Sequence, residues 1–357
     1  MTADHGAAPA PRHRRKSTAL APLPAGPEHF GLICGLPTSL TYLAADFARD
    51  LMQRAYGSCE VIGLNDMSEP TQDRLRQVHG PTLALTEVAD SDVVRLVGAR
   101  TFPVLVIEQG YAEACLSFMS LRKTSEIDTA RTMAFAQIGR HALAELSSAV
   151  RIQPHLGQQA RCLAEEIGDA LGIPAEVVES MIDERDLTRG ITEVLIQHFP
   201  SEADEQQTVA SQLLEELEAF YCLPSSPRPT RWRLPLAAMI EAAPPHRQMA
   251  GPIDLLGPAR QLICGPYLYL PRGKWKLAAL LTYKGSGSGD TFEFDLTADK
   301  EIKSTSRHVL FEDASMELTS EVEIIDPFHP FEFRTFLSAG SIGGSIIIES
   351  VDVRSLD

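Results

Sequence analysis

The feature that most constrains this chain is a change in the spacing of its apolar residues near its middle. In the first part, unbroken apolar runs alternate with helical patterns at about 41–56, 68–79 and 90–98. Parallel strands covered by helices read as continuous apolar runs, because neither face of such a sheet meets water. This part therefore predicts a three-layer α/β fold with a mostly parallel sheet. Its strand candidates are FGLICGL, CEVIGL, TFPVLVIE and the weaker PTLALTEV.

Beyond residue 258 the apolar residues alternate along short runs such as DTFEFDLTA and FEFRTFL. Glycine-rich turns such as KGSGSGD and SAGSIGG separate these runs. Alternation over short segments with frequent turns is typical of two packed antiparallel sheets. We therefore expect a β-sandwich over residues 259–357.

Three further regions precede the sandwich. Residues 1–28 are rich in alanine and proline and carry a short basic cluster, so we expect a disordered tail. Residues 29–222 form the α/β domain, whose later part is a helical extension. Residues 223–258 contain eight prolines and little periodicity, which predicts a linker or a strap that runs along the surface.

Composition excludes several classes of protein. The formal net charge of −16 disfavours nucleic acid as a partner. The six cysteines are scattered without ligand-like spacing, which favours reduced thiols over disulfides and gives no metal site. No run approaches the ~18 apolar residues of a membrane span, and the first residues lack a secretory signal. We therefore expect a cytoplasmic protein with no transmembrane segment.

The turn from Pro37 to Thr41 lies between an apolar strand and an amphipathic helix, where phosphate-binding loops are found. Such loops combine glycines with a Lys or Arg, and this turn has neither. No G-x-x-x-x-G-K-[ST] string occurs anywhere in the chain. The turn is therefore a working anion site of another kind, a degraded one, or an ordinary strand-to-helix connection.

Residues 30–222 resemble the bacterial P-loop sulfotransferase family in the order and spacing of three stretches. PTSLTYLA stands where that family has a loop like P-R-S-G-T-T-L-L. PVLVIEQGYAEACLSFM is similar to a later strand that ends in an R-D-P-type turn and leads into a helix with a serine. LSSAVRIQPHLGQQARCLAEEIGDALGIP is similar to a strand and loop before an amphipathic helix.

The resemblance implies a donor site at positions that have lost their charge. In the family, a cation in the loop and the arginine of the R-D-P turn hold the phosphates of phosphoadenosine phosphosulfate. Here the cation is replaced by Thr38, the loop glycine by Leu40, and the turn begins at Glu108. The donor-site positions are Pro37, Thr38, Ser39, Leu40, Thr41, Glu108 and Ser117.

These departures predict a degenerate donor site that needs no cofactor, although an arginine from elsewhere, Arg122 or Arg140, could replace the lost cation. Phosphoadenosine phosphosulfate is the cofactor only if the protein is active. No catalytic residue can be assigned. His79, His141 and His155 are each candidates for a base, and each is more typical of a structural or surface histidine.

The C-terminal part resembles the β-sandwich appended to some sulfotransferase-like and glycosyltransferase-like proteins of bacterial surface polysaccharide pathways. The stretch that carries this resemblance is LLGPARQLICGPYLYLPRGKWKLAALLTY. Sandwiches of this kind bind sugars against aromatic faces. The candidate glycan-binding residues are Tyr267, Tyr269, Trp275 and Tyr283, and Trp275 could equally fill the core.

Two functions follow from these resemblances. The first is a sulfotransferase-like protein of bacterial surface polysaccharide metabolism that has lost donor binding and acts by binding a glycan or a polysaccharide-assembly protein. The second is an active sulfotransferase, or related group transferase, that modifies a sugar hydroxyl. The first predicts no cation converging on the loop, whereas the second requires one. A homo-oligomer is compatible with either.

Overall fold

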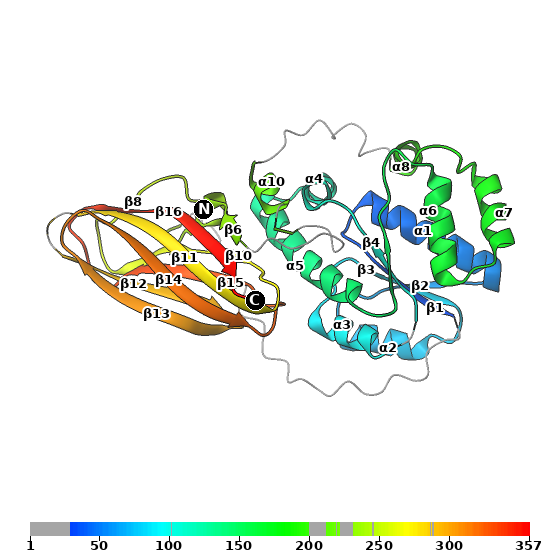
Figure 1. The fold of residues 1–357 in the computed structure, drawn as a ribbon, viewed down its shortest axis with the longest axis horizontal. Coiled ribbons are helices and arrows are strands. Elements are labelled where there is room, and N and C mark those ends of the chain that lie inside the picture. The colour runs from blue at the N-terminus through cyan, green and yellow to red at the C-terminus, as the bar shows by residue number, and fades with distance from the viewer. Residues whose placement is uncertain are drawn as a thin grey trace, which may run out of the picture.

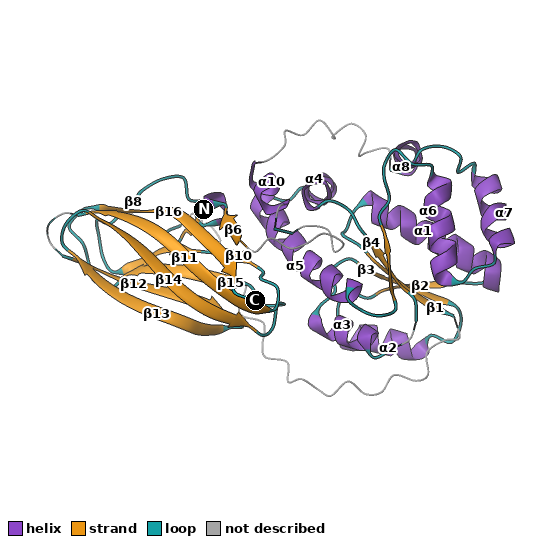
Figure 2. Ribbon diagram, in the orientation of Figure 1, coloured by secondary structure: helices purple, strands orange, loops and turns teal. Residues whose placement is uncertain are grey.

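The computed structural model describes residues 29–357 except 101, 200–211, 219, 222–230, 245, 286 and 288. Helices gather in the N-terminal half of the molecule and strands dominate the C-terminal half (Figure 2). The predicted disordered tail, residues 1–28, lies outside the described residues. None of the helices in the described ranges combines the length and apolar character that crossing a bilayer requires.

The N-terminal half contains a parallel sheet in the order β2-β3-β1-β4-β5. Successive residues of β1 point to opposite faces, so that Leu32 and Cys34 enter one apolar core and Ile33 enters the other. The predicted α/β class is confirmed by this arrangement. The strands are β1 (Phe30–Cys34), β2 (Glu60–Gly63), β3 (Thr82–Thr86), β4 (Val104–Ile107) and β5 (Ala149–Ile152).

Helices cover both faces of this sheet, which makes three layers (Figure 1). The face of Ile33 is covered by α1 (Ser39–Tyr56), α6 (Ala160–Leu171), α7 (Ala175–Arg185) and α8 (Ile191–His198). The opposite face is covered by α2 (Glu69–Gln77), α3 (Ser91–Gly98) and α5 (Glu126–Ala144). Two further helices, α4 (Tyr111–Arg122) and α10 (Gln212–Glu218), pack on each other beside the sandwich.

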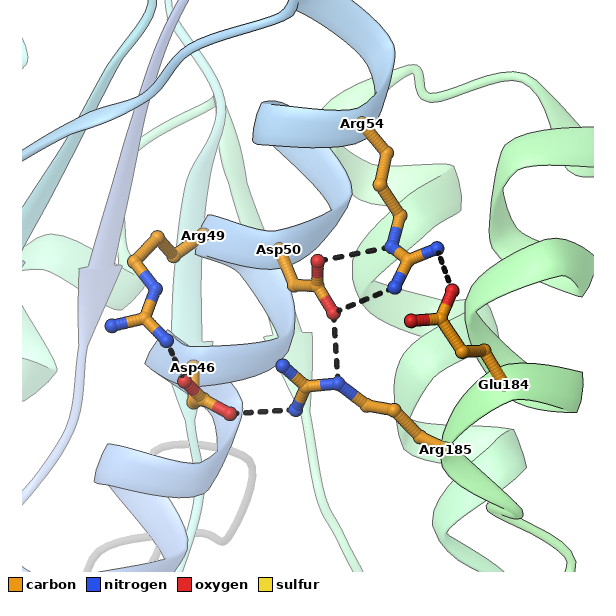
Figure 3. Close-up of polar contacts among 6 residues, drawn as sticks. All are labelled: Asp46, Arg49, Asp50, Arg54, Glu184 and Arg185. Atoms are coloured by element: carbon orange, nitrogen blue, oxygen red, sulfur yellow. Dashed lines mark hydrogen bonds and ion pairs between the residues drawn. The ribbon is translucent and has the colours of Figure 1, made fainter.

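An ion-pair network joins α1 to α7 (Figure 3). The Arg185 guanidinium lies 2.6 Å from an Asp46 oxygen and 2.8 Å from an Asp50 oxygen. Arg54 pairs with Asp50 at 2.9 Å and with Glu184 at 2.8 Å. A connected set of charges holds its geometry better than isolated surface pairs, so these contacts fix the angle of α7 on α1.

The C-terminal half is an antiparallel sandwich, as predicted. One sheet runs β13-β12-β15-β9-β7, with β10 beside β15, and the other runs β14-β11-β16-β6, with β8 beside β16. The strands are β6 (Arg231–Leu234), β7 (Ile240–Glu241), β8 (Ile253–Asp254), β9 (Arg260–Cys264), β10 (Pro266–Leu268), β11 (Gly273–Lys284), β12 (Asp290–Ala298), β13 (Glu301–Leu310), β14 (Ala314–Ile324), β15 (Phe331–Leu337) and β16 (Ser345–Ser355).

The predicted linker does not hold for residues 231–254. Strand β6 pairs with β16, β7 pairs with β9, and β8 pairs with β16. These strands are short and stand among prolines, which hid their alternation. Residues 222–230 and 245 of that region lie outside the described part of the chain.

The two halves share one apolar core. Buried side chains of α4, α5 and α10 belong to the same cluster as the interior of the sandwich. Phe220, which follows α10, stacks on Trp232 of β6 with ring centroids 3.9 Å apart. The Tyr221 hydroxyl donates to the Tyr269 carbonyl at 2.8 Å. From α5, Arg131 donates to the Pro266 carbonyl at 3.0 Å.

Candidate functional site

The turn after β1 is closed by its own side chains. Thr38 caps α1 by accepting from the Thr41 amide at 3.4 Å, and its hydroxyl donates to Gln109 Oε1 at 2.7 Å. Every residue from Pro37 to Thr41 is buried, and the exposed fraction of Thr38 is 0%. The hydroxyls that the sequence assigned to a ligand are therefore covered in this structure.

Gly35 is needed for this closed arrangement. A Cβ atom at Gly35 would lie 2.3 Å from Thr41 Oγ1 and 2.7 Å from its methyl group. Both distances are far below normal contact. The glycine of this turn therefore makes room for a threonine of the same chain, whereas the glycines of a phosphate loop make room for an anion.

The turn occupies the place where open α/β sheets bind ligands. Strands β1 and β4 are neighbours, yet β1 continues into α1 on one face and β4 leads to α5 on the other. The crevice outside such a pair of strand ends is the usual ligand site of the fold. Here it holds Glu108 and Gln109, which are 2% and 8% exposed.

Arg140, one of the two predicted replacement cations, lies beside this crevice. Its guanidinium donates to the Ile107 carbonyl at 3.3 Å and to the Gln109 carbonyl at 3.2 Å. The side chain is 1% exposed, so it supports the end of β4 from inside the protein. Burial raises the pKa of the nearby Cys34 thiol to about 12, and the charge of Arg140 opposes this rise.

A carboxylate from α10 occupies the N-terminus of α4, directly after the turn that begins at Glu108. The Ala112 amide donates to Glu218 Oε2, and a Cβ at Gly110 would lie 3.4 Å from Glu218 Oε1. The free amides and the dipole of a helix N-terminus favour a negative charge. The protein's own carboxylate thus stands where an anionic ligand could bind.

The remaining candidates of the α/β domain lie in several places. Burial raises the pKa of Tyr42, as does its hydrogen bond with Glu87, while Arg122 opposes the rise, so Arg122 lies near the first turn of α1. The Ser117 hydroxyl is covered and has no hydrogen-bond partner among the described residues. His79 and His155 are exposed, and His141 is buried against Gln137 at 3.0 Å.

The four predicted glycan-binding aromatics lie in two places. Trp275 and Tyr283 are 5% and 0% exposed and belong to the sandwich core. Tyr267 lies under the Arg131 guanidinium at 5.0 Å, and Tyr269 packs on Phe135 at 5.2 Å, so both face α5. Both tyrosines are partly exposed, and a helix of the other half packs against them. Glycan contact by these four residues stays a prediction.

Another set of side chains lies on the outer face of β12, β13 and β15. Phe336 is partly exposed, and the Arg334 guanidinium lies 5.7 Å from its ring centroid. Asp295 accepts from Arg334 at 2.9 Å and from Thr305 at 2.9 Å. Glu293 pairs across the sheet with both Phe336 and Arg307. We call this set, consisting of Phe336, Arg334, Asp295, Thr305, Glu293 and Arg307, the outer platform.

Sequence reasoning missed the outer platform although a signal was present. In FEFRTFL, alternation places Phe336 on the face of Glu332 and Arg334, opposite Phe331 and Phe333. A phenylalanine among charged residues on the solvent side of a strand is a candidate for binding. In the described part of the chain, no three His, Cys, Asp or Glu side chains gather as a metal site would require.

No family model and no curated protein matches this chain. Solved structures are similar to about a third of it. The CBM36-1 domain of a multidomain xylanase from the hindgut metagenome of Trinervitermes trinervoides is 12% identical over 36% of this chain and 98% of that one, with a TM-score of 0.25. A family 61 carbohydrate-binding module in complex with β-1,4-galactotriose is 11% identical over 35% and 82%, with a TM-score of 0.21. A family 16 module is 14% identical over 34% and 84%, with a TM-score of 0.20. Likeness at these scores carries no conclusion about function.

Proposed function

We propose that this protein binds a glycan through the outer platform of its sandwich and that its α/β half no longer binds a sulfate donor. The observation that carries the proposal is the placement of one partly exposed aromatic ring among fixed hydrogen-bonding side chains on a single sheet face. A sugar ring needs both an apolar surface for its C–H face and polar groups that orient its hydroxyls.

The outer platform supplies both in an ordered form. Phe336 offers its ring, while the partly exposed Arg334 is held by the nearly buried Asp295 and so needs little ordering when a ligand arrives. The Nε of Arg334 is covered, but the side chain is 25% exposed, which leaves its terminal guanidinium nitrogens to donate to a sugar oxygen. A guanidinium and a carboxylate side by side can donate to and accept from neighbouring hydroxyls.

The closed turn after β1 supports the second half of the proposal. Thr38 is bonded to Gln109, and Glu218 occupies the N-terminus of α4. A nucleotide phosphate would have to displace a carboxylate from the position it needs and break the contact between the two loops. In this proposal the α/β half derives from a sulfotransferase-like ancestor. The protein belongs to surface polysaccharide metabolism and acts by binding a glycan.

The proposal is tested by removing the platform ring. The variant Phe336→Ala should lose retention in polysaccharide-containing native gels, screened over a panel of bacterial surface polysaccharides. Phe311→Ala is the matched control, because Phe311 is another exposed phenylalanine of the sandwich, 59% exposed, and lies outside the platform. Retention of wild type and Phe311→Ala with loss in Phe336→Ala supports the proposal. Equal retention of all three proteins contradicts it.

A second function, an active transferase, is favoured by one observation. Arg140 lies beside the turn and could turn toward a phosphate if the loops opened. Calorimetric titration with 3′-phosphoadenosine 5′-phosphate separates the two functions. Micromolar affinity that is lost in Arg140→Gln would favour the transferase, and absence of binding would favour the glycan-binding protein.

A further inference from the structure

The inner side of strand β13 is polar where a sandwich needs apolar residues. Ser304, Ser306 and His308 alternate with exposed residues and point between the sheets. Strands β13 and β14 are edge strands of their respective sheets. They face each other at one open edge of the sandwich. Polar residues at core positions are costly unless they serve a function.

These small side chains leave a cleft of about 250 Å³ between the two edge strands. An engineered apolar cavity of about 150 Å³ binds benzene, so this cleft has room for a group somewhat larger than one such ring. Its deep walls are apolar and come from both sheets. They are formed by Leu277, Ala279, Phe294, Leu296, Phe333 and Val351.

The mouth of the cleft carries polar atoms. His308 meets Phe294 edge-on at 5.7 Å, and its Nε2 atom is covered yet has no hydrogen-bond partner among the described residues. Ser304, Ser306 and Ser320 add hydroxyls around it. A covered nitrogen without a partner is destabilising unless a ligand or water completes it.

We propose that this cleft binds an uncharged amphiphile, with a short alkyl or aromatic group between the sheets and a hydroxyl-bearing head at His308 and the serines. The apolar walls and the polar mouth match the two ends of such a molecule. A negatively charged head is disfavoured because none of the described residues that line the cleft is a lysine or an arginine that could pair with it. This site lies on the opposite side of the sheet from the outer platform and does not depend on glycan binding there.

The first experiment compares three probes by calorimetry on the full chain: octanol, octanoate and butanol. Octanol should bind at least about tenfold more tightly than butanol, because four additional methylenes leave water. It should also bind more tightly than octanoate, because the charged head is unfavourable at the mouth. Equal affinities for octanol and butanol, or tighter binding of octanoate, would overturn the proposal.

The second experiment fills the cleft. Ser306→Leu should raise the dissociation constant for octanol at least about tenfold while the melting temperature stays equal or rises, since the new side chain occupies apolar space. Val309→Leu is the matched control, because Val309 lies on the same strand and is 52% exposed. If Ser306→Leu does not fold, Ser304→Val supplies the same test with a smaller side chain. If the folded variant with the filled cleft still binds octanol with unchanged affinity, octanol binds elsewhere and the proposal is wrong.

Discussion

The turn after β1 and the outer platform of the sandwich both hold bonded polar side chains, and they differ in whether the neighbouring surface is open to water. In the turn, Thr38, Gln109 and Arg140 are bonded to atoms of the same chain and are nearly or wholly excluded from water. On the platform, Asp295 and Arg334 are also bonded to each other, but the neighbouring Phe336 stays partly exposed. The difference teaches that position in a fold does not make a site when the protein itself occupies every contact.

The largest expected effect comes from the buried arginine of the turn. Arg140→Ala leaves the carbonyls of Ile107 and Gln109 without their donor and opens a cavity, so we expect a loss of about 3–5 kcal/mol in the free energy of unfolding. Urea unfolding followed by circular dichroism measures it. Arg76→Ala, on the surface of α2, is the control and should change stability by less than about 0.5 kcal/mol. A small loss for Arg140→Ala would mean that the turn is not a tightly closed structure.

A second prediction tests whether the glycine of the turn serves packing alone. Gly35→Ala places a Cβ against Thr41 and should cost about 1–3 kcal/mol. Thr41→Ala removes the atoms that clash, so the double variant should recover part of that loss. Additive losses in the double variant would show that the two residues do not compete for the same space.

A third prediction concerns the carboxylate at the N-terminus of α4. Glu218→Gln removes the charge but keeps the shape, so we expect a loss of about 0.5–1.5 kcal/mol in stability. The same variant should bind inorganic sulfate better than wild type does, which equilibrium titration can measure. Unchanged stability together with unchanged sulfate affinity would remove the contact as an explanation for the closed site.

The smallest effect on stability is expected on the platform. Arg334→Gln removes the charged partner of Asp295, whose side chain is 6% exposed, but Thr305 still donates to that carboxylate, so we expect the free energy of unfolding to fall by no more than about 1 kcal/mol. Glycan retention should nevertheless fall as far as it does in Phe336→Ala. A variant that loses stability but keeps glycan retention would show that Arg334 has a structural role, as Arg140 does in the turn.

The regular elements of the fold could be predicted because each depends on local spacing. The continuous apolar run of β4 and the alternation of β15 are both visible in the sequence. What could not be predicted depends on contacts between distant segments. Nothing near Tyr267 and Tyr269 reveals that α5 packs against them, and nothing near Gly110 reveals that Glu218 reaches it. The sequence offered both Arg122 and Arg140 as cations near the turn. It could not say which of the two lies there, because the direction of a helix side chain depends on how the helix packs.

The stacking of Phe220 on Trp232 has a consequence for how this protein can be divided. A fragment that starts at residue 259 would lack both Phe220 and Trp232, together with the rest of β6. The apolar residues that these two rings cover would then be open to water. Such an exposed apolar patch promotes aggregation. We expect the two halves to unfold in one thermal transition and to be inherited together, so that neither is an exchangeable module.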